Sequence, residues 1–216
     1  MNDNHPILIY GQAAAGKTTF LGDLTELLLG RMPGYAAHLY TCEHWKAIQP
    51  QVDRGTIQTW RINTNEHPFE AVKFAADGFW PTNDGLKFEP SPVTIYEGLA
   101  TFSNFLAGND SDGGLASRNG RNESVNPSNS KDGPIRVTDG SVTTGKVSRS
   151  DYGFVQDTMQ SIVRRAQKRP GFTIWTSHDD EVDEMVNGQK TGRTVIGPEV
   201  FGGKLTTLIS REFVDV

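Results

Sequence analysis

Short apolar runs separated by longer amphipathic stretches make up most of this 216-residue chain. Apolar runs of about four to eight residues, bounded by turn signals, are typical of strands in a parallel sheet with both faces covered. The runs that fit this description are residues 7–10, 36–42, 93–96 and 172–176, and residues 56–62 alternate enough to form a further strand. We therefore predict a buried and mostly parallel sheet.

The stretches between these runs carry apolar residues at helical spacing. The clearest is residues 18–29, with apolar side chains at Phe20, Leu21, Leu24, Leu27 and Leu28. Further helices are expected at 68–79, 99–106 and 152–168, a loop at 80–92, and one or two closing strands within 205–209 and 212–216. Alternating strands and helices predict an α/β fold whose central sheet is flanked by helices.

Residues 107–150 differ from the rest of the chain in composition. Gly, Ser, Asn and Asp dominate this stretch, and it contains no aromatic residue. Such a segment buries too little apolar surface to offset its ordering entropy. We therefore expect a single domain over residues 1–216 with a polar, flexible insertion at about 107–150. A small hairpin is expected inside it, because two short β-prone runs flank Asp139-Gly140.

Charge and cysteine content narrow the function classes. The net charge is -5, so the surface as a whole does not favour nucleic acid, and any such binding requires a local patch. Cys42 is the single cysteine, which excludes an internal disulfide and fits a reducing compartment. No apolar run approaches the length of a membrane span, and the first residues lack a signal-peptide pattern. We expect a soluble protein of the cytoplasm.

The most specific motif follows the first apolar run and reads Gly-x-x-x-x-Gly-Lys-Thr, the phosphate-binding loop of nucleoside-triphosphate enzymes. Its two glycines allow a sharp turn and a close approach to phosphate, and its amides and the following helix N-terminus attract an anion. Lys17 is expected to reach the β- and γ-phosphates, and the Thr18 hydroxyl to hold Mg²⁺. The predicted nucleotide-binding residues are Gly11, Gln12, Ala13, Ala14, Ala15, Gly16, Lys17, Thr18 and Thr19.

Polar side chains at the ends of three other runs are candidates for the chemistry. Glu97 is expected to bind Mg²⁺, although aspartate is the usual residue there and a glutamate would act through water. Glu43 is the candidate base that orients the attacking water, and His178 the candidate sensor of the γ-phosphate. Each of the three has an ordinary alternative as a surface polar residue. His44 is expected to be structural.

These motifs occur in an order that resembles the RecA-like ATPase core, and more narrowly the small phage-encoded RecA-like nucleotide-binding proteins. Tyr40-Thr-Cys-Glu43-His44 is similar to the strand whose final glutamate is the catalytic base, and Val93-Thr-Ile-Tyr-Glu97-Gly98 is similar to the Walker B strand. Thr176-Ser177-His178 stands where this family has a strand ending in a polar residue that couples the γ-phosphate to the next loop. Phe201-Gly-Gly-Lys204 resembles the segment before the closing strands.

The resemblance implies a RecA-like P-loop core, with ATP and Mg²⁺ as cofactors and a homo-oligomeric ring or filament. It also implies single- or double-stranded DNA as a partner, because residues 107–150 and 179–199 occupy the two loops that touch DNA in RecA. The charges of these loops leave DNA binding open. The first has six Lys or Arg against five acids, and the second begins with five acids in six residues, whereas phosphate binding requires excess positive charge.

Three functions remain open at this stage. The first is an ATP-hydrolysing phage protein of DNA metabolism that acts in recombination, annealing or packaging. The second is a non-catalytic nucleotide-binding protein, a virion or assembly component whose oligomerisation ATP controls. The third is a small-molecule phosphotransferase, which usually has an Arg-rich lid that this sequence lacks.

Overall fold

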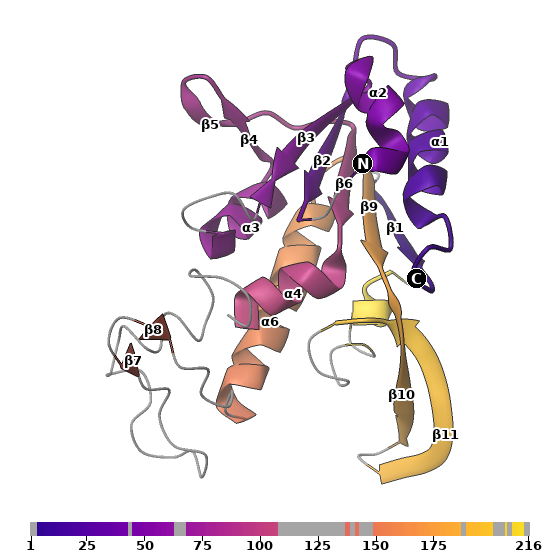
Figure 1. The fold of residues 1–216 in the computed structure, drawn as a ribbon, viewed down its shortest axis with the longest axis vertical. Coiled ribbons are helices and arrows are strands. Elements are labelled where there is room, and N and C mark those ends of the chain that lie inside the picture. The colour runs from indigo at the N-terminus through magenta and orange to yellow at the C-terminus, as the bar shows by residue number, and fades with distance from the viewer. Residues whose placement is uncertain are drawn as a thin grey trace.

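The centre of the protein is a five-stranded sheet in which every strand runs parallel to its neighbours (Figure 1). The computed structural model describes residues 4–42, 45–62, 68–107, 137–138, 141–142, 149–186, 189–200, 206 and 209–213. The strand order across the sheet is β1 (Asn4–Tyr10), β9 (Gly171–Ser177), β6 (Val93–Glu97), β2 (Ala37–Thr41) and β3 (Ile57–Arg61). The carboxyl ends of all five strands therefore meet at one edge of the sheet.

Helices cover both faces of this sheet (Figure 1). One face carries α1 (Lys17–Leu29), the 3₁₀ turn η1 (Lys46–Ile48) and α2 (Gln49–Asp53). The other face carries α3 (Pro68–Ala76), α4 (Leu99–Ala107) and α6 (Arg149–Gln167). The predicted α/β fold with a parallel sheet flanked by helices is confirmed.

The two faces differ in their side chains. The face under α1 is aliphatic, with Leu39, Ile95 and Ile174 fully buried on neighbouring strands. The next residue on each of these strands is aromatic and points to the opposite face: Tyr40, Tyr96 and Trp175. The Tyr40 and Tyr96 rings stack with centroids 5.1 Å apart, and those of Tyr96 and Trp175 with centroids 4.1 Å apart. Successive residues of a strand point to opposite faces of the sheet. The same pairing of the strands therefore aligns the aliphatic side chains on one face and the aromatic rings on the other.

The two tyrosines also anchor α3 and the segment that follows it. The Tyr96 hydroxyl donates to the carbonyl of Ala75 at 2.9 Å, and the Tyr40 hydroxyl donates to the carbonyl of Phe79 at 3.0 Å. Burial raises the pKa of Tyr40 to about 12 and raises the pKa of Tyr96 further. Both phenols therefore remain neutral donors at ordinary pH.

The loop predicted for residues 80–92 is wrong over its first part. The chain forms an antiparallel hairpin there, β4 (Phe79–Thr82) with β5 (Gly85–Phe88). Trp80 is buried in this hairpin, where its ring stacks on that of His38 with centroids 4.0 Å apart. Burial of that large ring against the sheet provides a reason for the ordered pairing, which the polar sequence around the turn does not indicate.

Residues 179–199, where the resemblance to RecA implies a loop, are paired strands over most of their length. They form an antiparallel hairpin, β10 (Asp179–Val186) with β11 (Gln189–Pro198), that extends away from the sheet (Figure 1). The predicted closing strands are wrong where the structure describes them, because Thr206 and residues 209–211 are helical. Ile209 packs into the aromatic core from this helical turn.

The small hairpin expected around Asp139-Gly140 is confirmed by the pairing of β7 (Val137–Thr138) with β8 (Ser141–Val142). The rest of the predicted insertion lies largely outside the described residues, between the end of α4 and the start of α6 at Arg149. Among the helices that the structure describes, none is long and apolar enough to cross a bilayer.

His38 provides a pH-dependent test of this packing. Burial, with a smaller contribution from the charge of Arg169, lowers the pKa of His38 from 6.5 to about 4. The unfolded chain therefore binds a proton at a higher pH than the folded chain, so this residue lowers stability as pH falls from 6.5 towards 4. The loss expected at pH 4 is about 3 kcal/mol.

We expect His38→Phe to keep a ring against Trp80 and to remove this part of the acid destabilisation, as measured by urea unfolding between pH 7 and pH 4. His5→Phe, a change at an exposed histidine of β1, is the matched control. It should leave the dependence of the unfolding free energy on pH unchanged. A His38→Phe variant with the parental pH slope would contradict the assignment.

Candidate functional site

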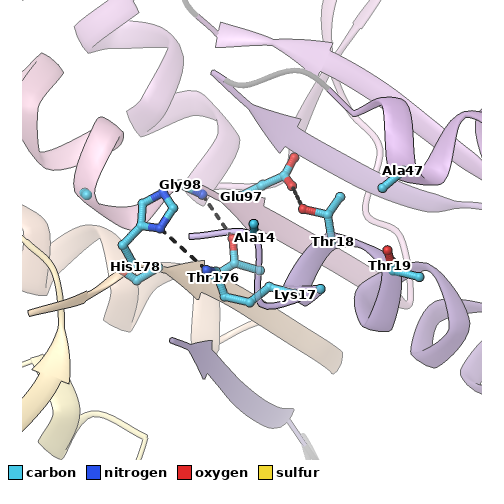
Figure 2. Close-up of a pocket in the computed structure, with 12 residues that line it drawn as sticks. Ala14, Lys17, Thr18, Thr19, Ala47, Glu97, Gly98, Thr176 and His178 are labelled. Carbon is cyan, nitrogen blue, oxygen red and sulfur yellow. Dashed lines mark hydrogen bonds between the residues drawn. The ribbon is translucent and has the colours of Figure 1, made fainter. Parts of the chain in front are cut away.

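A cavity of about 340 Å³ opens at the carboxyl edge of the sheet (Figure 2). It lies between the loop that joins β1 to α1 and the ends of β6 and β9. The polar residues that line it are Lys17, Thr18, Thr19, Glu97, Thr176, Ser177 and His178. Clefts outside the carboxyl ends of parallel strands are where α/β sheets bind ligands.

The loop on one side of the cavity has a backbone that few side chains tolerate. Ala14 has φ 62° and Gly16 has φ 83°, both in the left-handed region. Gly16 is also the N-cap of α1, and no side chain caps this end of the helix. The first amides of an α-helix have no acceptor within the helix. Because Gly16, Lys17, Thr18 and Thr19 line the cavity, these amides and the helix dipole favour an anion there.

Lys17 is bound to the backbone of its own loop. Its Nζ atom donates to the carbonyl of Gly11 at 2.7 Å and to that of Gln12 at 2.7 Å. The same Nζ lies 3.5 Å from Nδ1 of His178, which approaches from the end of β9 (Figure 2). The predicted sensor and the predicted phosphate-binding lysine therefore lie beside each other.

Glu97 is the buried charged group of the site, with only 2 % of its surface exposed. The Thr18 hydroxyl donates to Oε1 of Glu97 at 2.9 Å, and the Thr41 hydroxyl donates to Oε2 at 3.1 Å. A buried carboxylate is tolerated when donors such as these satisfy it. The carboxylate predicted to bind metal therefore lies next to the hydroxyl predicted to bind metal (Figure 2).

Sequence reasoning missed Thr41. In the sequence it is a polar residue at the end of a buried strand, and that position alone does not point to Glu97. The β2–β6 register pairs the two residues directly, so their side chains share the face covered by α1. Only the strand order, which brings β2 next to β6, reveals this contact.

Hydrogen bonds donated by backbone amides join the ends of these elements. The Gly98 amide donates to the Thr176 hydroxyl at 3.1 Å, which ties the residue after β6 to β9. The Asp179 amide donates to the Gly11 carbonyl at 3.2 Å, and the Glu199 amide donates to the His178 carbonyl at 2.7 Å. The base of the β10–β11 hairpin is therefore hydrogen-bonded to the loop that joins β1 to α1.

The structure thus brings four predicted site residues together: Lys17, Thr18, Glu97 and His178. Of the other predicted nucleotide-binding residues, Ala14, Gly16 and Thr19 also line the cavity. Gly11 and Gln12 supply carbonyls to Lys17, while Ala13 and Ala15 belong to the same turn. Glu43 and His44 lie outside the described residues.

The donors present fit a magnesium–nucleotide complex. Mg²⁺ is usually held by one or two carboxylates together with substrate phosphates and water, rather than by a cage of protein ligands. Thr18 and Glu97 provide such a partial set beside the loop that joins β1 to α1. Within the described residues there is no group of three or more His, Cys, Asp or Glu that could hold a metal alone, so phosphates and water would have to complete the metal's coordination.

Comparison of the chain with models of protein families gives no match, and comparison with curated proteins gives no significant similarity. The function of this chain therefore has to be inferred from the geometry of the site.

Proposed function

We propose that this protein binds ATP with Mg²⁺ at the carboxyl edge of its sheet and hydrolyses it. The observation that carries the proposal is the convergence of Lys17, Thr18 and Glu97 on one cavity. The three residues come from a strand–loop–helix motif and from a separate strand, so their meeting is not a consequence of the motif alone. The confirmed parallel sheet supports the RecA-like reading of the sequence.

In this proposal the loop amides and Lys17 hold the β- and γ-phosphates, and Mg²⁺ neutralises the charge that develops on the transferred phosphoryl group. Thr18 would hold the metal, and Glu97, whose carboxylate accepts a hydrogen bond from Thr18, would bind the metal through water. His178 lies 3.5 Å from the Lys17 ammonium, a position from which it would detect the γ-phosphate. Glu43, two residues beyond the end of β2, would orient the attacking water.

The cellular role that we propose is DNA metabolism in a phage-infected cell, as a RecA-like protein that assembles into a ring or filament. This part rests on the order of motifs in the sequence. The resemblance to RecA makes DNA the expected partner of the segment that contains the β10–β11 hairpin. The charge of this hairpin weighs against direct contact with DNA. Residues 179–184 carry five acids, whereas β11 carries only Lys190 and Arg193 as bases, and DNA binding requires the opposite balance.

That charge balance favours the second candidate function, a non-catalytic nucleotide-binding virion or assembly protein. In such a protein ATP would control oligomerisation without being consumed. ATP turnover measured with and without single-stranded DNA separates the two functions. DNA-stimulated turnover supports the first, and tight ATP binding without turnover supports the second.

We expect Lys17→Ala to weaken ATP binding by about 10- to 100-fold, because hydrogen bonds to a charged group contribute about 1.5–3 kcal/mol. Fluorescence titration with a labelled ATP analogue measures the affinity, and thermal unfolding checks the fold. Lys168→Ala, at an exposed lysine beyond the end of α6, is the matched control. Equal affinity in the Lys17→Ala variant and the parent would rule out the phosphate-binding assignment.

We expect Glu43→Gln to keep the parental ATP affinity and to lower turnover by about 10²–10⁴-fold, since an amide cannot accept the water's proton. Phosphate release under saturating ATP measures the turnover. If the parent hydrolyses ATP and the variant hydrolyses it equally fast, Glu43 is not the base. A parent that binds ATP and shows no turnover would favour the non-catalytic function.

A further inference from the structure

Thr41 contacts Glu97 but has no role in the chemistry of the proposed function. It is the last residue of β2, it is fully buried, and its hydroxyl donates to Oε2 of Glu97 at 3.1 Å. The other carboxylate oxygen, Oε1, accepts from the hydroxyl of Thr18 at 2.9 Å. Two threonines from different elements therefore hold the two oxygens of one carboxylate.

We propose that Thr41 is a positioning residue for the metal site: it fixes the rotation of the Glu97 carboxylate and, through it, the orientation of the Thr18 hydroxyl. This inference rests on the proposed function, because it assigns Thr41 a role in binding the magnesium–nucleotide complex. Thr41 itself contacts neither metal nor nucleotide in this proposal.

The need for positioning follows from the glutamate side chain. Its terminal torsion, which rotates the carboxylate plane, is broad and has no sharply preferred staggered value. The bond from Thr18 reaches only Oε1, so this bond by itself does not fix that plane. A second donor on Oε2 selects one orientation, and Thr41 is placed for this by the direct β2–β6 register between Thr41 and Glu97.

The orientation matters because of how a hydroxyl binds a cation. Thr18 has one proton, which it donates to Glu97, so its oxygen lone pairs are directed away from the carboxylate. Thr18 lines the cavity, so in this proposal those lone pairs are the ones that would face a bound cation. Mg²⁺ requires near-ideal octahedral geometry, and loss of an outer-shell partner typically lowers metal affinity or activity by about 10- to 100-fold.

A purely structural role for Thr41 predicts something different. Removing the hydroxyl would then lower stability and would change nucleotide affinity to the same extent with and without metal. The positioning role predicts a selective loss of the part of the affinity that depends on Mg²⁺. The ratio of the two affinities therefore separates the roles.

The test compares Thr41→Val with Thr41→Ser in the full-length chain. Affinity for a fluorescent ATP analogue is measured in excess Mg²⁺ and in EDTA. We expect Thr41→Val to reduce the Mg²⁺-dependent gain in affinity by about 10- to 100-fold, and Thr41→Ser, which keeps the hydroxyl, to restore most of it. Thr25→Val is the matched control, because Thr25 is another fully buried threonine whose hydroxyl donates to the Leu21 carbonyl within α1.

A double-mutant cycle tests whether Thr41 acts on the metal site through Glu97. If Thr41 acts through Glu97, Thr41→Val should change the Mg²⁺ dependence in the parent and have little further effect in a Glu97→Gln background. Should Thr41→Val fail to fold, Thr41→Cys keeps a similar volume with a weaker donor and should shift the ratio in the same direction.

The outcomes are distinct. A parent that binds the analogue in a Mg²⁺-dependent way and a Thr41→Val variant with an unchanged ratio would overturn the positioning role and leave the proposed function intact. Equal losses in Mg²⁺ and in EDTA would also overturn it. A parent that binds no nucleotide under either condition would overturn the proposed function and this inference together.

Discussion

The arrangement of the site depends on satisfying one buried carboxylate. Transferring an ionised carboxyl group from water into a protein interior costs several kcal/mol unless hydrogen-bond donors surround it. At Glu97 the donors include hydroxyls from α1 and from β2, while the carboxylate itself belongs to β6. Because three elements must contribute at hydrogen-bonding distance, this requirement fixes where the phosphate loop lies relative to the sheet.

The same register that satisfies Glu97 also builds the core. On β2 and β6, Thr41 and Glu97 face α1, and the residues just before them, Tyr40 and Tyr96, stack on the opposite face. A slip of one residue would place the carboxylate among aromatic rings and the rings under α1. The stacking of the rings and the hydrogen bonding of Glu97 therefore require the same register of β2 and β6. A shift that disrupted one would also disrupt the other.

Sequence reasoning succeeded where burial leaves a strong pattern. Four of the five parallel strands contain an apolar run because helices cover both faces, and the phosphate-binding motif has a fixed spacing. The sheet, α1 and the position of Lys17 and Thr18 at the sheet edge were therefore predictable. The β4–β5 and β10–β11 hairpins were missed for a physical reason. Strands β5 and β11 are largely exposed, so no alternation of apolar and polar residues marks them.

The closing segment shows the opposite error. Residues 205–209 were predicted as a strand from a short apolar run, yet 209–211 are helical and Ile209 packs into the aromatic core. A run this short cannot distinguish a buried strand from a turn of helix.

Thr41 marks a further limit, because its importance comes from a neighbour 56 residues away in the chain. At this site the residue types could be predicted from the sequence, whereas the strand order could not. The Gly11 carbonyl shows why that order matters for the proposed binding. It accepts from both Lys17 Nζ and the Asp179 amide. In the proposed function, a phosphate that draws Lys17 away would replace bonds to neutral carbonyls with a bond to a charged oxygen. The bond from the Asp179 amide would remain and would hold the loop backbone in place.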